Sequence, residues 1–314
     1  MTSLTALLGA LGRQARWALV VGVFAGIAIP PLAAALRPLL APVVIATLTA
    51  ALLRLDWTQL AAAAVRPALP LALTAWMLAV APLAAWLVSG ALGLAPDLRL
   101  VLLLQAAAPP IGSAAVFVLI LGFDAVLAMV VTVAATLLLP LSLTPLVALL
   151  LPEAGVRVDL AAFFVRASLL VALPFVLAAI LRRAIGVARL AAADDIVGGL
   201  NVVLLAVFAI AVMDGLTARL LADPATILRL LIVACAAAVV LHAAGWWLFR
   251  RAGADHALNA AVTSGNRNMG LMLVVTSGTA GETFALYVAI AQLPMYFAPL
   301  LLSPLAARLR SRSQ

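Results

Sequence analysis

The chain has 314 residues, of which 67% are hydrophobic and 10% are charged, whereas an ordinary soluble domain is about 45–50% apolar and about 25% charged. This small number of charged side chains cannot cover a soluble core of this length. Most of the surface must therefore face lipid. The composition excludes a soluble fold and predicts a polytopic membrane protein.

The formal net charge of +8 comes from 19 basic residues, all of them arginine, against 11 acidic residues. The arginines stand singly or in pairs at the ends of apolar runs rather than forming a stripe, so the lipid bilayer is the expected partner and nucleic acid is not. The lone cysteine, Cys235, allows no intramolecular disulfide and is read as a buried, inert thiol.

Ten apolar runs of about 20 residues are separated by clusters of charge, proline and glycine, which predicts an all-α protein with ten transmembrane helices. The predicted spans are Trp17–Ala35, Leu39–Leu55, Pro67–Gly93, Leu98–Leu121, Ala125–Leu151, Leu160–Leu181, Ile196–Leu216, Ala225–Phe249, Ala257–Thr276 and Glu282–Ala306.

The arginine distribution predicts the orientation. An even number of spans puts both termini on one side, and cytoplasmic loops are enriched in arginine. With the N-terminus inside, four arginines lie outside, three lie in or near spans, and twelve are cytoplasmic: Arg13, Arg16, Arg54, Arg66, Arg182, Arg183, Arg189, Arg250, Arg251, Arg308, Arg310 and Arg312. Both termini are therefore expected in the cytoplasm. Heavy use of Ala, Leu and Arg without Lys is typical of high-GC bacterial coding, so the expected location is a bacterial inner membrane.

The chain divides into two halves of five spans, residues 1–153 and 154–314. Because five is an odd number, a repeat of this kind is necessarily inverted, which is the usual architecture of secondary transporters.

Each half has one span with a helix-breaking stretch at the corresponding position. The fourth span contains Pro109–Ser113, where two consecutive prolines remove two backbone donors. The ninth contains Thr263–Asn268, where Gly265 is flanked by polar residues and favours unwinding. Irregular backbone at membrane depth is tolerated only inside protein or beside a cavity, so the two breaks predict a substrate site near the midplane.

Arg267 is the most informative residue, because it lies ten residues into the ninth span with no acidic residue within reach along the helix. A central arginine costs roughly 2.5–3.5 kcal/mol on insertion scales, so the fold must offset it. It is interpreted as a fixed cation that faces the cavity, to bind an anion or to replace a transported cation. The alternative is a residue satisfied by the exposed carbonyls of the other broken helix, and both can hold at once.

Other polar or small residues in or near the breaks are candidates for binding substrate, although helix–helix hydrogen bonding and close packing explain them equally simply. These candidates are Asn266, Asn268, Thr263, Ser264, Gly112, Ser113 and Gln292. The sequence has no metal-ligand spacing, no phosphate-binding glycine loop and no nucleophile–base motif, so neither an enzyme nor a cofactor is predicted.

Several stretches resemble the bile acid:sodium symporter family. They are Leu53–Asp56, Arg66–Pro67, Pro82, Ala107–Val116, Leu143–Pro145 and Gly265–Leu271. The resemblance covers most of the chain. It implies ten spans as a five-plus-five inverted repeat, a panel of spans 1, 2, 6 and 7, and a core whose broken fourth and ninth helices cross.

The resemblance implies an organic anion as cargo, carried by rocking of the core against the panel. The positions that resemble the family's sodium ligands are Met77, Ala114, Ala115, Thr263 and the pair Arg267–Asn268, and only Asn268 keeps the family residue. Sodium prefers several oxygen ligands, so we expect Arg267 to act as a built-in cation and transport not to be coupled to sodium in the family's usual way.

The leading hypothesis is therefore a secondary transporter of a small organic anion by alternating access. Three alternatives stay open: a sodium-coupled symporter of bile acid-like anions, an arsenite permease-like exporter, and a membrane sensor that does not transport. The arsenite reading rests on Gln292–Pro294, but the cysteine that those permeases carry in span 4 is absent. The sequence leaves monomer and homodimer equally open.

Overall fold

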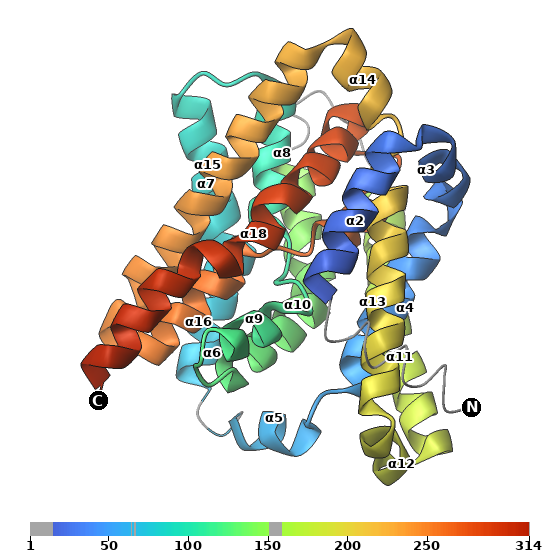
Figure 1. Ribbon diagram of the computed structural model, residues 1–314. Helices are drawn as coiled ribbons and strands as arrows, with labels where there is room; N and C mark the ends of the chain where they lie inside the picture. Colours follow the sequence, from blue (N-terminus) through green and yellow to red (C-terminus); the bar gives the residue numbers. More distant parts are fainter. Residues whose placement is uncertain (1–14, 64, 66, 151–158, 314) are drawn as a thin grey trace.

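The computed structural model describes residues 15–63, 65, 67–150 and 159–313. This part of the chain is helical (Figure 1), and its described residues form no strand beyond one bridged pair. Seven helical segments are long and apolar enough to cross a membrane: Pro30–Leu53, Ala68–Ala91, Val126–Leu150, Leu160–Ile185, Asp194–Ala222, Pro224–Ala252 and Gly281–Leu309. The predicted all-helical, multi-pass character is therefore confirmed, while the predicted boundary at residues 153 and 154 lies outside the described residues.

The helices follow one another with short connections. In the first half they are α2 (Ala15–Ala28), α3 (Pro30–Leu36), η1 (Arg37–Leu39), α4 (Leu40–Leu53), α5 (Trp57–Ala63), α6 (Ala68–Ala75), η2 (Trp76–Val80), α7 (Ala81–Ala91), α8 (Pro96–Ala107), α9 (Ala114–Ile120) and α10 (Val126–Leu150). In the second half they are α11 (Leu160–Ile185), α12 (Val187–Ala192), α13 (Asp194–Ala211), α14 (Leu216–Ala222), α15 (Pro224–Phe249), η4 (Arg250–Ala252), α16 (Ala254–Gly265), α17 (Met269–Val275) and α18 (Gly281–Ser313).

The predicted boundary between the first two spans is wrong. The chain turns at Ile29, whose φ of −125° and ψ of 72° are not helical, and not after Ala35. Pro30 and Pro31 begin the next helix, because proline lacks the N–H that a first helical turn leaves unpaired and its fixed φ suits that position. The first helix, α2, is consequently shorter than predicted.

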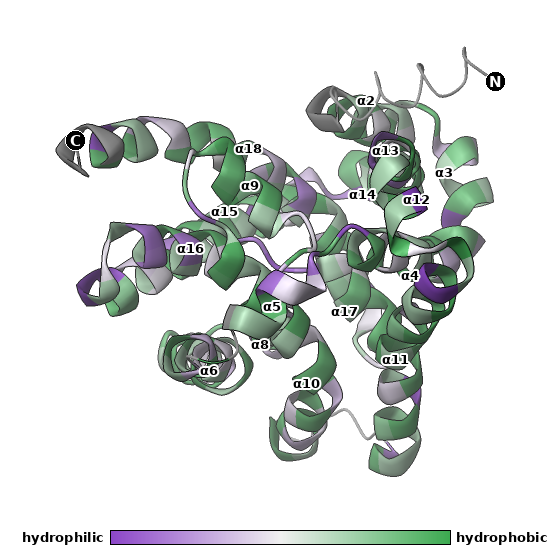
Figure 2. Ribbon diagram, turned by 90° about the horizontal axis from the view of Figure 1, so that it is seen from below, coloured by the Kyte–Doolittle hydropathy of each residue, from purple (hydrophilic) through white to green (hydrophobic). Residues whose placement is uncertain are grey.

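The helices form two groups. The α4 group consists of α2, α3, α4, α11, α13 and α14, within which α13 packs against α2 and α4, and α4 packs against α11. The α16 group consists of α6, η2, α7, α8, α9, α10, α15, α16 and α18, within which α15 packs against α16 and α18. Figure 2 shows the α4 group on the right and the α16 group on the left, with α17 between them. The α17 helix contacts both α4 and α18.

Large apolar side chains cover the outside of the molecule. Leu221 is 81% exposed and Leu87 is 69% exposed, and Figure 2 shows hydrophobic residues on the outward sides of most helices. A soluble protein rarely exposes so much contiguous apolar surface, whereas lipid solvates it at no cost.

Two glycines allow α15 and α16 to approach closely. A Cβ on Gly245 would lie 2.4 Å from the Ala260 carbonyl oxygen, and a Cβ on Gly265 would overlap the His242 ring. Backbone cannot move aside as a flexible side chain can, so small residues are required at this helix–helix contact.

We expect Gly245→Ala to lower the free energy of unfolding by about 1–3 kcal/mol, because the new methyl group overlaps a backbone carbonyl. The measurement is the thermal midpoint of the purified protein in detergent. Gly112→Ala is the matched control, because its Cβ would make an ordinary 3.4 Å contact with Ala51. Equal midpoints for the two variants would contradict the close packing of α15 on α16.

Candidate functional site

The two predicted helix-breaking stretches lie side by side at the ends of helices. The α8 helix ends at Ala107 and α9 begins at Ala114, while α16 ends at Gly265 and α17 begins at Met269. Between them, Ile111 N donates to Asn266 O (2.9 Å) and Asn268 N donates to Pro109 O (2.7 Å).

These two hydrogen bonds flank an antiparallel bridge between Pro110 and Arg267. In such a bridge the two opposed residues donate nothing to each other, so the N–H that Pro110 lacks is not needed. The crossing thus satisfies irregular backbone that would otherwise be costly in a membrane.

Arg267 joins the carbonyl ends of two helices. Its side chain is 1% exposed. Nε donates to Ser264 O (2.6 Å) at the end of α16, and Nη1 donates to Ala108 O (2.8 Å) at the end of α8. The C-terminal ends of helices carry partial negative charge, so two of them offset part of the cost of a buried cation. Nη2 has no hydrogen-bond partner among the described residues.

The partly buried His242 and the buried Asn266 form a hydrogen-bonded pair beside this crossing. His242 Nδ1 lies 2.7 Å from Ala238 O and therefore carries the proton, which leaves Nε2 to accept from Asn266 Nδ2 (3.1 Å). Asn266 Nδ2 also donates to Val262 O (2.9 Å). The imidazole occupies the space where Gly265 would carry a Cβ, which explains glycine at this helix end.

Asn268 holds the start of α17. Its Oδ1 accepts from Leu271 N (3.0 Å), as in an N-cap. Asn268 also lines a cavity, so this residue lies at the boundary between the crossing and open space.

A cavity of about 830 Å³ lies between the two helix groups. It is lined by the partly buried Gly112 and Ser113, by the buried Asn268 and Gln292, and by apolar residues of α4, α9 and α13. It extends to exposed residues of α5 and to α12, which lie at the lower end of the molecule in Figure 1. The cavity is therefore open at the end that carries α5 and α12.

Charged groups at the mouth of the cavity are already paired. Arg54 forms a bidentate ion pair with Asp194, with Nε–Oδ1 and Nη2–Oδ2 distances of 2.7 and 2.9 Å. The hydrogen bonds that Arg54 donates to the Asp194 carboxylate raise the pKa of Arg54, so this guanidinium stays charged. Asp56 caps α5, and the hydrogen bond from the Thr58 hydroxyl lowers the pKa of its carboxyl group. Arg182 Nη1 donates to the carbonyls of Leu53 and Leu55.

The structure divides the predicted site residues into two sets. Gly112, Ser113, Asn268 and Gln292 line the cavity. Arg267, Asn266, Thr263 and Ser264 lie outside its lining, as do Pro109, Pro110 and Gly265, although all seven are buried or at the crossing beside it.

Two of the residues outside the lining bond within the α16 group. Thr263 Oγ1 donates to Asn259 O (2.7 Å) on its own helix, and Ser264 Oγ accepts from Trp76 Nε1 (3.0 Å). Their hydroxyl groups are therefore used for packing in this conformation.

Three uncharged polar residues of the lining that lie inside predicted spans were not predicted as site residues: Thr47, Asn201 and Tyr296. Each is a polar residue inside a predicted span, and this feature of the sequence could have marked it as a candidate for lining a site. Gln105, a similar residue, is instead bonded by the Tyr287 hydroxyl and is buried within the α16 group.

Among the described residues, no group of three or more His, Cys, Asp or Glu side chains lies close enough to hold a metal ion. No protein-family model matches the chain, and no curated protein matches it in sequence.

Replacing Asn268 by alanine should cost about 1 kcal/mol of stability, because the cap of α17 is lost. Asn268→Ser retains a capping oxygen and should remain close to the wild type. Thermal midpoints of both variants in detergent provide the measurement, and a midpoint for Asn268→Ala equal to that of Asn268→Ser would argue against the capping role.

Proposed function

We propose that this chain is a secondary transporter that carries a small organic anion across a membrane by alternating access. The observation that carries the proposal is the cavity of about 830 Å³ between the two helix groups, which is open at one end and lined by residues from both interrupted stretches. Its size suits a small organic molecule.

The helix arrangement supports ten spans in two inverted halves. In this reading α8 with α9, and α16 with α17, are interrupted spans that together with α2 join the seven long helices. The α4 group corresponds to the panel and the α16 group, with α17, to the core of the bile acid:sodium symporter family. We therefore propose that the chain is a divergent member of that family.

The arginines favour an inner-membrane orientation with the mouth of the cavity in the cytoplasm. Arg54 and Arg182 line the mouth, and Arg183 and Arg189 follow on the same end of α11 and on α12. Cytoplasmic ends of spans are enriched in arginine, so this conformation would be open to the inside.

Arg267 supports a transporter that does not need sodium at the crossing. Its guanidinium lies where two helix C-termini present carbonyl oxygens, which is a favourable place for a cation. Because this cation is covalently attached, the crossing holds together without a bound ion, and sodium close to it would be repelled.

The same charge favours an anion as cargo. Arg267 makes no ion pair with any described acidic residue, and the next residue in the chain, Asn268, lines the cavity. An anion bound beside Asn268 would compensate a buried positive charge that the protein itself leaves without a counter-ion.

The first test is uptake by proteoliposomes in sodium-free buffer, using labelled carboxylates and sulfonates that raise the thermal midpoint of the purified protein. We expect uptake of at least one anion by the wild type and a loss of about tenfold or more in Arg267→Gln, because the counter-charge is removed. Full transport by Arg267→Gln would refute the role of Arg267. If no anion raises the midpoint and none is taken up, the transporter proposal fails.

The built-in cation makes a separate prediction. The thermal midpoint of the wild type should be the same in Na⁺ and K⁺ at equal ionic strength, because an ion that binds only the folded state raises the midpoint by mass action. Arg267→Lys is the control for a purely electrostatic effect: it keeps the positive charge, so its thermal midpoint should also be the same in Na⁺ and K⁺. A rise specific to sodium in the wild type would support the sodium-coupled alternative instead.

Filling the cavity tests its role directly. Ser113→Trp should reduce uptake to background without a large loss of stability, because the indole enters existing space rather than a packed core. Leu119→Trp is the matched control, because Leu119 lies at the exposed rim of the same cavity. Undiminished uptake by Ser113→Trp would exclude this cavity as the route.

A further inference from the structure

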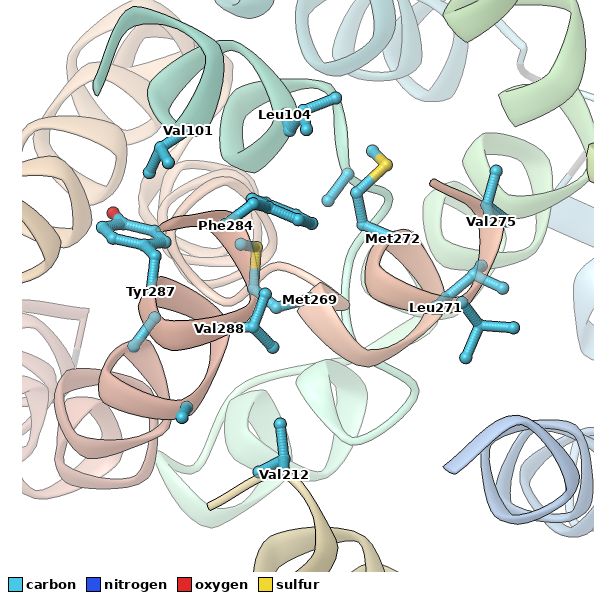
Figure 3. Packing of buried hydrophobic residues seen from close by; sticks show 14 of the residues in the cluster. Val101, Leu104, Val212, Met269, Leu271, Met272, Val275, Phe284, Tyr287 and Val288 are labelled. Atoms are coloured by element: carbon cyan, nitrogen blue, oxygen red, sulfur yellow. The ribbon is translucent and has the colours of Figure 1, made fainter. Parts of the chain in front are cut away.

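The two helix groups are separated by the cavity at one end and packed together at the other. At the packed end, Val212 and Met213 of the α4 group belong to the same buried cluster as Met269, Leu271 and Val288. Figure 3 shows Val212 pointing toward Met269 and Val288. We call these five residues the closed end, because their apolar contacts separate the cavity from the side of α3 and α14.

Most polar side-chain bonds of the α4 group stay within it. Arg37 pairs with Asp214 (2.8 Å) and Arg54 pairs with Asp194 (2.7 Å), so both ion pairs tie the α4 segment to the α13 segment, one at each end. Arg182 bonds to the carbonyls that end α4. Movement of the whole group against its neighbour would leave these bonds intact.

Arg166 is different, because its hydrogen bonds leave the α4 group and reach α17 and the turn after it, which lie between the two groups. It lies near the start of α11, at the end remote from Arg182 and the mouth of the cavity. Nη2 donates to Val274 O (3.0 Å) in α17, and Nη1 donates to Ser277 O (2.7 Å) in the turn that follows. A guanidinium at the carbonyl end of a helix is well placed electrostatically.

From this placement we infer that Arg166 is a latch for the closed end. Its two hydrogen bonds hold the end of α17 on α11 while the cavity is open at α5 and α12, and they must break before the closed end can open. The inference rests on the proposed function, since a latch between the groups has a purpose only if the groups move.

The test measures access to the closed end and needs no substrate. Val212→Cys is the reporter, in a background where Cys235, the single native cysteine, is changed to serine. A membrane-impermeant maleimide is applied from each side of the membrane separately. With Arg166 intact, labelling should be slow; Arg166→Gln should raise its rate about tenfold from the side of α3 and α14, the factor that corresponds to about 1.4 kcal/mol.

Arg182→Gln is the matched control. Arg182 also lies on α11 and donates two hydrogen bonds to carbonyls at a helix end, but within the α4 group. It should leave the labelling rate of Val212→Cys unchanged. If Arg166→Gln labels no faster than its parent, or if both variants raise the rate equally, the latch is refuted. If Arg166→Gln does not fold, Arg166→Lys replaces it, with a smaller increase expected because one ammonium group replaces two guanidinium donors.

The labelling result separates this inference from the proposed function. Faster labelling of Arg166→Gln in a protein that carries no anion would uphold the latch and refute transport. Uptake of an anion with unchanged labelling would uphold transport and refute the latch.

Discussion

The crossing of the two interrupted stretches depends on one buried guanidinium. Arg267 is held by the carbonyl ends of α8 and α16, and no described carboxylate shares its charge. The two backbone hydrogen bonds beside the bridge bring these helix ends together. They pair two N–H groups, those of Ile111 and Asn268, with two carbonyl oxygens, those of Asn266 and Pro109. The same crossing places Gly112 and Asn268 in the lining of the cavity. Arg267 itself is packed behind that surface, so its influence on a ligand is electrostatic in this conformation.

Composition and breaker residues predicted the broad fold because both act locally. A chain with so little charge requires lipid as solvent, and a pair of prolines or a glycine among polar residues ends a helix wherever it stands. The turn at Ile29 was not predicted because apolar residues continue on both sides of it. A rule that divides the chain at polar residues does not detect a turn that contains none. Pro30 and Pro31 were the better signal, since proline is common at the first position of a helix.

The site was less predictable because cavity exposure depends on helix partners. Arg267 and Asn268 are neighbours in sequence, yet only Asn268 lines the cavity. Which of them does so is decided by where α17 begins and by the position of α8, which lies about 160 residues earlier in the chain. Asn201 and Tyr296 reach the same cavity from α13 and α18. A single sequence carries no information on such pairings, so isolated polar residues in spans could be noted but not assembled.

The polar side-chain bonds lie mostly within each helix group rather than between the groups. The α4 and α13 segments are joined by ion pairs at both ends, and the carbonyls that hold Arg267 belong, like most of its surroundings, to the α16 group. Breaking the hydrogen bonds of the buried Arg267 inside a membrane would be costly, because no water would replace the lost partners. The contact between the groups is instead largely apolar at the closed end and open at the other. A buried charge compensated within one group stays compensated when that group moves, whereas an ion pair across the groups would oppose the motion. In the proposed transporter, the cation of Arg267 would therefore stay compensated while the cavity changes the side to which it opens.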